Sequence, residues 1–206
     1  MRTALALAAV LALGPAQAAS GPRWATFAGV HVGGAQDDLL ALNADCRPLA
    51  DVGGFQGHYN PQRVADLAFG FSLPHFDHDS AAAAQALGNA ALCQVDVIDG
   101  RMRGWIVTID RMVVGATFYP NPRDTLTPSK DSVRALLVAA WGRPTAPAPT
   151  LDSWLGTRYR SYLITDRVAM PSGLKHYRVI IVDVSACSAF DRRVHRFSHR
   201  GTAQAC

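Results

Sequence analysis

Residues 93–122, CQVDVIDGRMRGWIVTIDRMVVGATFYPNP, carry the clearest fold signal of the 206-residue chain. Apolar and polar residues alternate through this stretch, and the dipeptide Asp99-Gly100 is a common turn in β-hairpins. The alternation predicts three strands, over residues 94–99, 102–110 and 113–119. It places Trp105, Val107 and Ile109 on one face of the second strand. The stretch therefore predicts an antiparallel meander.

The residues after the meander predict one helix and about three more strands. Thr127 can cap a helix that has Pro128 at its first position, and Gly142 would end it. The apolar stripe of this helix would consist of Val133, Leu136, Leu137, Ala140 and Trp141. Residues 145–150 read as a connector, residues 152–155 and 158–165 as a hairpin, and residues 177–184 as a strand buried on both faces.

The residues before the meander predict shorter elements. Residues 24–32 suit a strand or an extended entry segment, and residues 37–42 suit a short helix. Loops are expected over residues 47–61 and 72–79, and the alanine-rich run over residues 81–92 predicts a helix. The whole pattern predicts an α+β fold, in which two to three helices pack on one face of a mostly antiparallel sheet of about five to six strands.

The first eighteen residues have the features of a secretory signal peptide. Arg2 supplies the positive charge, residues 4–13 the apolar run, and Ala16 and Ala18 the small residues of a cleavage site. The run is too short to cross the ~30 Å hydrocarbon core of a bilayer. We therefore expect cleavage near Ala18-Ala19 and a periplasmic or secreted protein. Because no cysteine follows the cleavage region, we expect no lipid anchor.

The remaining residues, 19–206, suit a single domain. A boundary near residue 125 is the other arrangement that the pattern permits, but one shared core is favoured. Hydrophobic residues make up 49% of the chain and charged residues 17%, which is typical of a globular domain. The net charge of +4 is too small to indicate nucleic-acid binding, and no later stretch is long and apolar enough to cross a membrane.

Four cysteines, an even number in a chain expected to be exported, predict two disulfides. Cys187 and Cys206 are nearest in sequence, and a bond between them would hold the C-terminal tail. Cys46 and Cys93 would then form the other bond. We favour this pairing, although three pairings are open to four cysteines. The wide spacing argues against a zinc knuckle.

Two phrases of the sequence resemble those of small exported α+β proteins. One is FAGVHVG at residues 27–33, followed by the short helix at residues 37–42. The other covers residues 136–144, ends in WGRP and precedes a strand that contains Trp154. Similar phrases occur in outer-membrane assembly lipoproteins of the SmpA/OmlA type and in β-lactamase-inhibitor-like domains. The resemblance implies a non-catalytic role in binding or assembly, although the anchoring cysteine of the lipoproteins is absent.

Two histidine-containing segments are candidate metal sites. Zn²⁺ could bind to the nitrogen and oxygen atoms of four residues that are close in sequence: His75, Asp77, His78 and Asp79. Their order differs from that of zinc hydrolases, and Asp79 is more simply explained as a helix cap. His195 and His199 would share a helix face, but the glutamate of an H-E-x-x-H motif is missing. A polar surface loop is therefore favoured over a zinc site.

Two groups of side chains are candidates for binding an anion or a partner. The C-terminal group is the most basic stretch of the chain and contains Arg192, Arg193, Arg196 and Arg200. Arginines of this kind suit phosphate or anionic lipid head groups, although a solvated face is the favoured interpretation. The second group lies on the strand predicted over residues 158–165, where Arg158, Arg160 and Tyr162 share one face. The pattern does not decide whether that face is buried.

Catalytic chemistry has little support in the sequence. There is no G-x-S-x-G segment and no phosphate-binding glycine loop, and the cysteines are expected to be oxidised. All 16 acidic residues are Asp, and a catalytic pair among them would need the fold to bring two together. We therefore assign no catalytic residue and no cofactor. The expected function is non-enzymatic binding of an envelope protein or an anionic envelope component. The alternative is a secreted, metal-dependent hydrolase that uses His75, Asp77, His78 and Asp79, with Zn²⁺ as the candidate metal.

Overall fold

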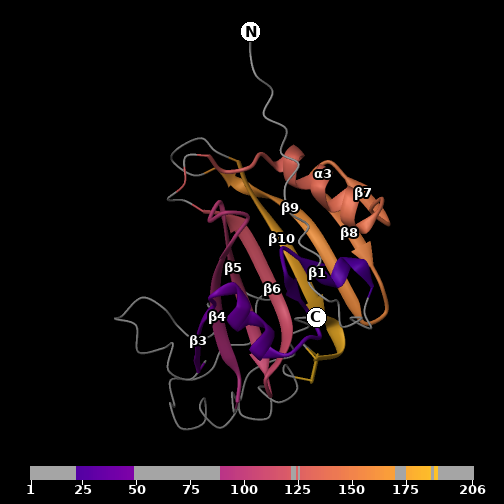
Figure 1. Ribbon diagram of the computed structural model, residues 1–206. Helices are drawn as coiled ribbons and strands as arrows, with labels where there is room; N and C mark the ends of the chain where they lie inside the picture. Colours follow the sequence, from indigo (N-terminus) through magenta and orange to yellow (C-terminus); the bar gives the residue numbers. More distant parts are fainter. Residues whose placement is uncertain are drawn as a thin grey trace.

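The computed structural model describes residues 22–48, 89–121, 124, 126–169, 175–186 and 188–189. Within these ranges the chain forms an antiparallel sheet of eight strands and a separate two-stranded ribbon (Figure 1). The predicted signal peptide, most of the predicted alanine-rich helix, and Cys187 and Cys206 lie outside the described residues.

The N-terminal elements are short. They are the 3-10 helices η1 (Arg23–Ala25) and η2 (Gln36–Leu42) and the ribbon strands β1 (Thr26–Phe27) and β2 (Val30–His31). The large sheet contains β3 (Asp45–Pro48), β4 (Ala91–Val97), β5 (Met102–Ile109), β6 (Met112–Pro120), β7 (Ala146–Ala148), β8 (Leu151–Leu155), β9 (Tyr159–Ala169) and β10 (Lys175–Asp183). The helix α3 (Lys130–Trp141) comes between β6 and β7 in the chain.

The large sheet consists of two four-stranded meanders placed side by side. Its strand order is β3-β4-β5-β6-β10-β9-β8-β7, so strands that are consecutive in sequence are neighbours within each half. Only the pairing of β6 with β10 joins the halves, with Thr117 opposite Ile180 and Ala116 opposite Ile181. The predicted meander over residues 94–119 is confirmed as β4, β5 and β6. The antiparallel sheet of the predicted fold is confirmed as well.

Two tight turns fix the register of the first meander. Val97 pairs with Met102 around a turn in which Ile98, Asp99 and Gly100 have positive φ, so the predicted turn at Asp99-Gly100 is present but β4 ends at Val97, before the predicted end at residue 99. Ile109 pairs with Met112 around Asp110 and Arg111, which also have positive φ values of 49° and 62°. Two such residues in succession make the turn that matches the right-handed twist of paired strands, although glycine is usual at the second position.

The helix α3 begins two residues later than the sequence predicts. Ser129, not Thr127, is the N-cap, and its Oγ accepts a hydrogen bond from the backbone N–H of Ser132 at 3.1 Å. The predicted apolar stripe is partly wrong. Val133, Leu137 and Trp141, spaced four residues apart, are buried, whereas Leu136 is 52% exposed and Ala140 is exposed. The side of α3 that packs against the core is therefore narrower than predicted and consists of Val133, Leu137 and Trp141.

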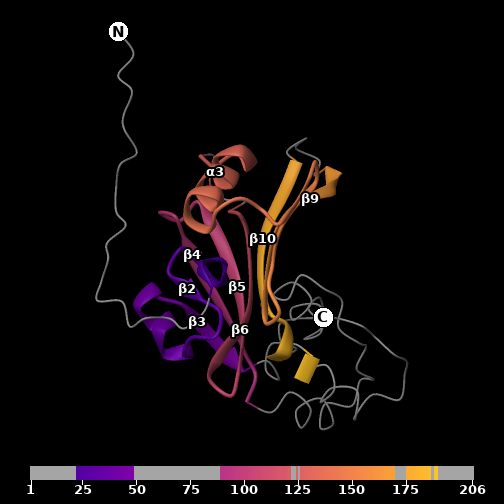
Figure 2. The ribbon, with the colours of Figure 1, turned by 90° about the vertical axis from the view of Figure 1, so that its right-hand side faces the viewer.

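One hydrophobic cluster fills the space between the sheet and the elements that cover it. It takes side chains from both meanders, from α3 and from the N-terminal ribbon. Figure 2 shows α3 and the N-terminal elements on the same side of the sheet. We call this side the core face and the opposite side the outer face. Within the cluster Phe27 contacts Phe118, with ring centroids 4.9 Å apart, and Trp141 contacts Trp154 at 5.1 Å.

The number of strands corrects the prediction of five to six. The two strands that the sequence pattern does not predict, β3 and β7, occupy the two edges of the sheet. Each contains a proline, Pro48 or Pro147, which weakens the strand signal. An edge strand needs hydrogen bonds on one side only, so it tolerates a residue without an N–H group.

The start of β4 corrects a second prediction. The alanine-rich helix was expected to reach residue 92, but β4 begins at Ala91 and includes Leu92. Leu92 is 4% exposed and pairs with Val107 of β5. Pairing with an existing hairpin satisfies the backbone groups of these residues and outweighs their helix propensity.

The predicted bond between Cys46 and Cys93 is present, with an S–S distance of 2.00 Å. The two cysteines lie directly opposite each other on β3 and β4. The described residues thus contain one disulfide rather than the two expected. None of the helices in the described ranges is both long and apolar enough to span a membrane.

Candidate functional site

Most of the predicted site residues lie outside the described part of the chain. These are the histidine and aspartate group of His75, Asp77, His78 and Asp79, and the basic group of Arg192, Arg193, Arg196 and Arg200. His195 and His199 are also outside. Among the described residues, no three His, Cys, Asp or Glu side chains come together in a way that could hold a metal ion. The predicted residues that can be placed are Arg158, Arg160 and Tyr162.

The alternation along β9 separates the two faces of the sheet. Tyr159, Ser161 and Leu163 are buried, and Tyr159 and Leu163 belong to the core cluster. Arg160 and Tyr162 therefore belong to the outer face, where both are half-buried. Their strand partners on β10 are Val182 and Ile180, respectively.

The register brings further cationic and aromatic side chains onto the outer face. Arg103 of β5 is opposite Tyr119 of β6. Val179 is opposite Phe118, so Arg178 is at the next position beside Tyr119. Trp105 is two residues from Arg103 on the same strand and thus on the same face. These side chains are half-buried, and together with Arg160 and Tyr162 they form what we call the arginine–aromatic patch.

Hydrogen bonds orient the first half of this patch. The guanidinium of Arg103 donates to both carboxylate oxygens of Asp96, at 2.9 and 3.2 Å. The hydrogen bond with Asp96 raises the pKa of Arg103. The indole Nε1 of Trp105 donates to the hydroxyl oxygen of Tyr119. These contacts hold the side chains of β5 in fixed directions.

Among the described side chains, the patch has more cationic than anionic groups. On the outer face of β4, β5, β6 and β10, and of the part of β9 with described side chains, the guanidiniums of Arg103, Arg160 and Arg178 outnumber the one carboxylate, that of Asp96. The alternation of residues 93–122 could have revealed Arg103 and Trp105 as neighbours on one strand face. Arg178 could not be added, because its position depends on which strand β10 pairs with.

Arg158 has a different environment from Arg160. It precedes β9, and its Nε donates to Asp183 at 2.8 Å, across the end of β10. The Asp183 carboxylate is only 3% exposed and also accepts hydrogen bonds from the backbone N–H groups of Ser185 and Ala186, each at 3.0 Å. The hydrogen bond with Asp183 raises the pKa of Arg158. Its guanidinium carbon also lies 5.0 Å from the ring centroid of Tyr159.

Arg158 and Asp183 border a pocket of about 410 Å³ at this end of the sheet, which we call the junction pocket. It forms where the edge of β6 changes partner. Residues 115–118 of β6 pair with β10, whereas Val113 exchanges hydrogen bonds with Gly33 and Gly34, at 2.7 and 2.9 Å. The wall of the junction pocket consists mainly of apolar side chains, which are those of Ile109, Met112, Val113, Val114, Ala186 and Ala189.

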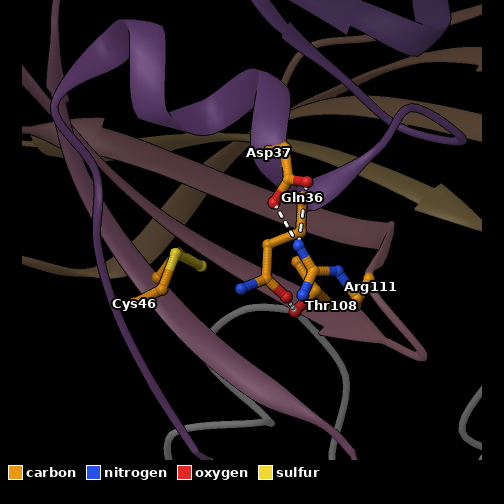
Figure 3. The surroundings of a disulfide bond; sticks show 6 residues. Gln36, Asp37, Cys46, Thr108 and Arg111 are labelled. Carbon is orange, nitrogen blue, oxygen red and sulfur yellow. Dashed lines mark hydrogen bonds and ion pairs between the residues drawn. A yellow bond between two sulfur atoms is a disulfide. The ribbon is translucent and has the colours of Figure 1, made fainter.

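A second pocket, of about 680 Å³, lies on the other side of the turn at Asp110 and Arg111, beside Cys46. Figure 3 shows the side chains that connect η2 to the β5–β6 hairpin here. Thr108 Oγ1 donates to Gln36 Oε1 at 2.8 Å, and Arg111 contacts both carboxylate oxygens of Asp37, at 2.6 and 2.8 Å. These bonds fasten η2 to the hairpin, and the disulfide fastens β3 to β4, so we assign them a structural role.

Comparison with known proteins gives no relative from which a function could be transferred. No family model matches the chain, and neither does any curated protein or any solved structure. The resemblance to SmpA/OmlA-type lipoproteins and β-lactamase-inhibitor-like domains stays a prediction. Function can therefore be inferred only from the chemistry of the described residues, above all those of the arginine–aromatic patch and the junction pocket.

Proposed function

We propose that this protein is an exported, non-enzymatic binding protein that holds an anionic component of the cell envelope on its arginine–aromatic patch. The observation that carries the proposal is the row Arg103, Tyr119 and Arg178 on three adjacent strands. Neighbouring strands are about 4.8 Å apart, so the row presents alternating cationic and aromatic groups at short, regular intervals.

The chemistry of the patch suits an anionic partner. A guanidinium presents planar donors that match the two oxygens of a phosphate or a carboxylate. Tyrosine and tryptophan offer a large apolar surface with a polar edge, and both are enriched at binding surfaces together with arginine. The guanidinium of Arg103 is bonded to Asp96, and Arg160 and Arg178 add two further guanidiniums to the described part of the patch. The second candidate partner, an envelope protein, would need an acidic surface to match.

Binding to vesicles tests the proposal. The full-length protein should bind phosphatidylglycerol vesicles more tightly than phosphatidylcholine vesicles, and the preference should fall as salt increases. The double variant Arg160→Gln/Arg178→Gln should bind the anionic vesicles roughly 30-fold less tightly, since each arginine near an anionic surface contributes about 1 kcal/mol. Arg143→Gln is the matched control, because Arg143 is exposed just after α3.

Three results would refute the assignment. They are equal binding to neutral vesicles, an equal loss for Arg143→Gln, and a loss found only on substituting Arg192, Arg193, Arg196 and Arg200. The last result would move the binding function to the C-terminal basic group. Circular dichroism of each variant checks that the fold is retained.

A further inference from the structure

The junction pocket has the form of a small-molecule site that is separate from the arginine–aromatic patch. Its volume of about 410 Å³ lies within the range of ligand pockets, about 300–1,000 Å³. Its wall consists mainly of apolar side chains, with charged groups at one border. Met112, part of this wall, is 43% exposed although it is a large apolar residue. A hydrocarbon group would cover such a side chain.

The charged border of the pocket favours an anion over a cation. The Asp183 carboxylate already accepts three hydrogen bonds, from Arg158, Ser185 and Ala186, so it has little capacity left for a ligand. Arg158 bonds to Asp183 through Nε, and within the described ranges its two Nη groups have no hydrogen-bond partner. The side chain of Arg158 is 60% exposed. Its terminal donors are therefore available to an anionic head group.

The position of Arg158 is fixed before any ligand binds. Asp183 holds one edge of the guanidinium, and the guanidinium carbon lies over the Tyr159 ring, 5.0 Å from its centroid. Tyr159 is 8% exposed, and its hydroxyl is packed against Gly33, where an added Cβ would come within 2.5 Å of the oxygen. A guanidinium held on two sides loses little conformational entropy when it binds an anion.

We propose that the junction pocket binds an amphiphilic anion, with its hydrocarbon chain against the apolar wall and its head group on Arg158. Asp110, at the turn beside the pocket, is the one lining carboxylate among the described residues that has no hydrogen bond to Arg158. It weakens the binding of an anion by repulsion. Neutralising Asp110 should therefore strengthen the binding of the anion, whereas neutralising Arg158 should weaken it.

Calorimetric titration of the full-length protein with dodecanoate, below its micelle concentration, tests the proposal. We expect saturable binding at one site. Acetate, which has the head group without the chain, and dodecyltrimethylammonium, which has the chain with the opposite charge, should each bind about tenfold more weakly or worse. Arg158→Gln should lower the affinity for dodecanoate about tenfold or more, because it removes charged hydrogen bonds.

Two further variants keep the test valid if Arg158→Gln fails to fold. Ala189 is exposed at the pocket, so Ala189→Trp narrows the pocket without disturbing the core and should also weaken binding. The matched control is Ala139→Trp, at an exposed position on α3 away from the pocket. Asp110→Asn should strengthen the binding of dodecanoate several-fold at low salt.

The proposal is overturned if dodecanoate shows no saturable binding or if dodecyltrimethylammonium binds as tightly. A weaker affinity in Asp110→Asn would also overturn it, since that result indicates a cationic ligand. The double variant Arg160→Gln/Arg178→Gln should keep its affinity for dodecanoate. Failure of the pocket and failure of the patch are therefore distinguishable.

Discussion

The two faces of the large sheet use the same strands but distribute their chemistry differently. On the core face, the cluster includes Met102 and Ile106 of β5 and Tyr177, Val179 and Ile181 of β10. On the outer face, the character changes along each strand. Val107 and Val182 are buried at one end, and Arg103 and Arg178 are half-buried at the other.

Tryptophan shows the same difference between the faces. On the core face, the indole groups of Trp141 and Trp154 donate to backbone carbonyls, those of Thr26 at 2.8 Å and Gly142 at 3.0 Å. The first bond joins α3 to the N-terminal ribbon, and the second joins β8 of the sheet to the end of α3. On the outer face, Trp105 donates to the hydroxyl of another side chain, that of Tyr119. The comparison indicates that indoles of the core face bond to the backbone of the packed elements, whereas the indole of the outer face bonds to a neighbouring side chain of the proposed binding surface.

The strongest test of this comparison removes an indole from the core face. Trp154 is 1% exposed and contacts Trp141 edge to face. Trp154→Ala should lower the free energy of unfolding by about 3–5 kcal/mol, through lost burial and a cavity. Urea denaturation measures the change. A loss below about 1 kcal/mol would mean that the core face is not the main source of stability.

The disulfide should have the next largest effect. Cys93 is fully buried in the core cluster, and the bond closes a loop of 47 residues. Replacing both cysteines, as Cys46→Ala/Cys93→Ala, should cost about 2–4 kcal/mol, because the unfolded chain regains conformational freedom. The same urea experiment under non-reducing conditions gives the value. Unchanged stability would show that β3 is held to β4 without the bond.

High pH should destabilise the core face through Tyr177. This side chain is 3% exposed, and its hydroxyl donates to the carbonyl of Pro128 at 2.7 Å. Burial raises the pKa of Tyr177 to about 12, above its ordinary value of 10.0. The stabilisation is complete below pH 10 and is lost as the pH rises from 10 to 12, by up to about 2–3 kcal/mol.

The variant Tyr177→Phe separates this effect from other titrations at high pH. It removes the ionisable hydroxyl, so its stability should fall less steeply between pH 10 and 12 than that of the wild type. Thermal melts across this range measure the slopes. Parallel slopes for the two proteins would exclude Tyr177 as the cause.

The smallest effect is expected on the outer face. Trp105 is half-buried there, so Trp105→Ala should cost about 1–2 kcal/mol, well below the cost of Trp154→Ala. Binding to anionic vesicles should weaken in the same variant, since Trp105 belongs to the arginine–aromatic patch. A cost equal to that of Trp154→Ala would remove the distinction between the two faces.

The sequence predicts the local parts of this fold well and the non-local parts poorly. The turn at Asp99-Gly100, the meander around it and the last strand depend on neighbouring residues, and their patterns are visible in the chain. The edge strands β3 and β7 become strands only because a partner strand lies beside them. The cap of α3 could not be decided either, since Thr127 and Ser129 are both suitable.

The candidate sites follow the same rule. Alternation predicts that Arg160 and Tyr162 share a face, but only the pairing of β6 with β10 brings them toward Tyr119 and Trp105. The junction pocket combines residues near positions 33, 110, 158 and 186, which no spacing in the sequence connects. Such a pocket becomes visible only after the strand order is known.

The single pairing between the two meanders also has a kinetic consequence. The strands β4 to β6 and β7 to β10 can pair from residues that are close in sequence, but β6 and β10 meet only after the chain between them has closed a long loop. We therefore expect the pairing of β6 with β10, which is the seam between the two meanders, to form last during folding. Ile180→Ala should then speed unfolding far more than it slows refolding in stopped-flow experiments. A φ-value near one at Ile180 would instead make the seam the folding nucleus.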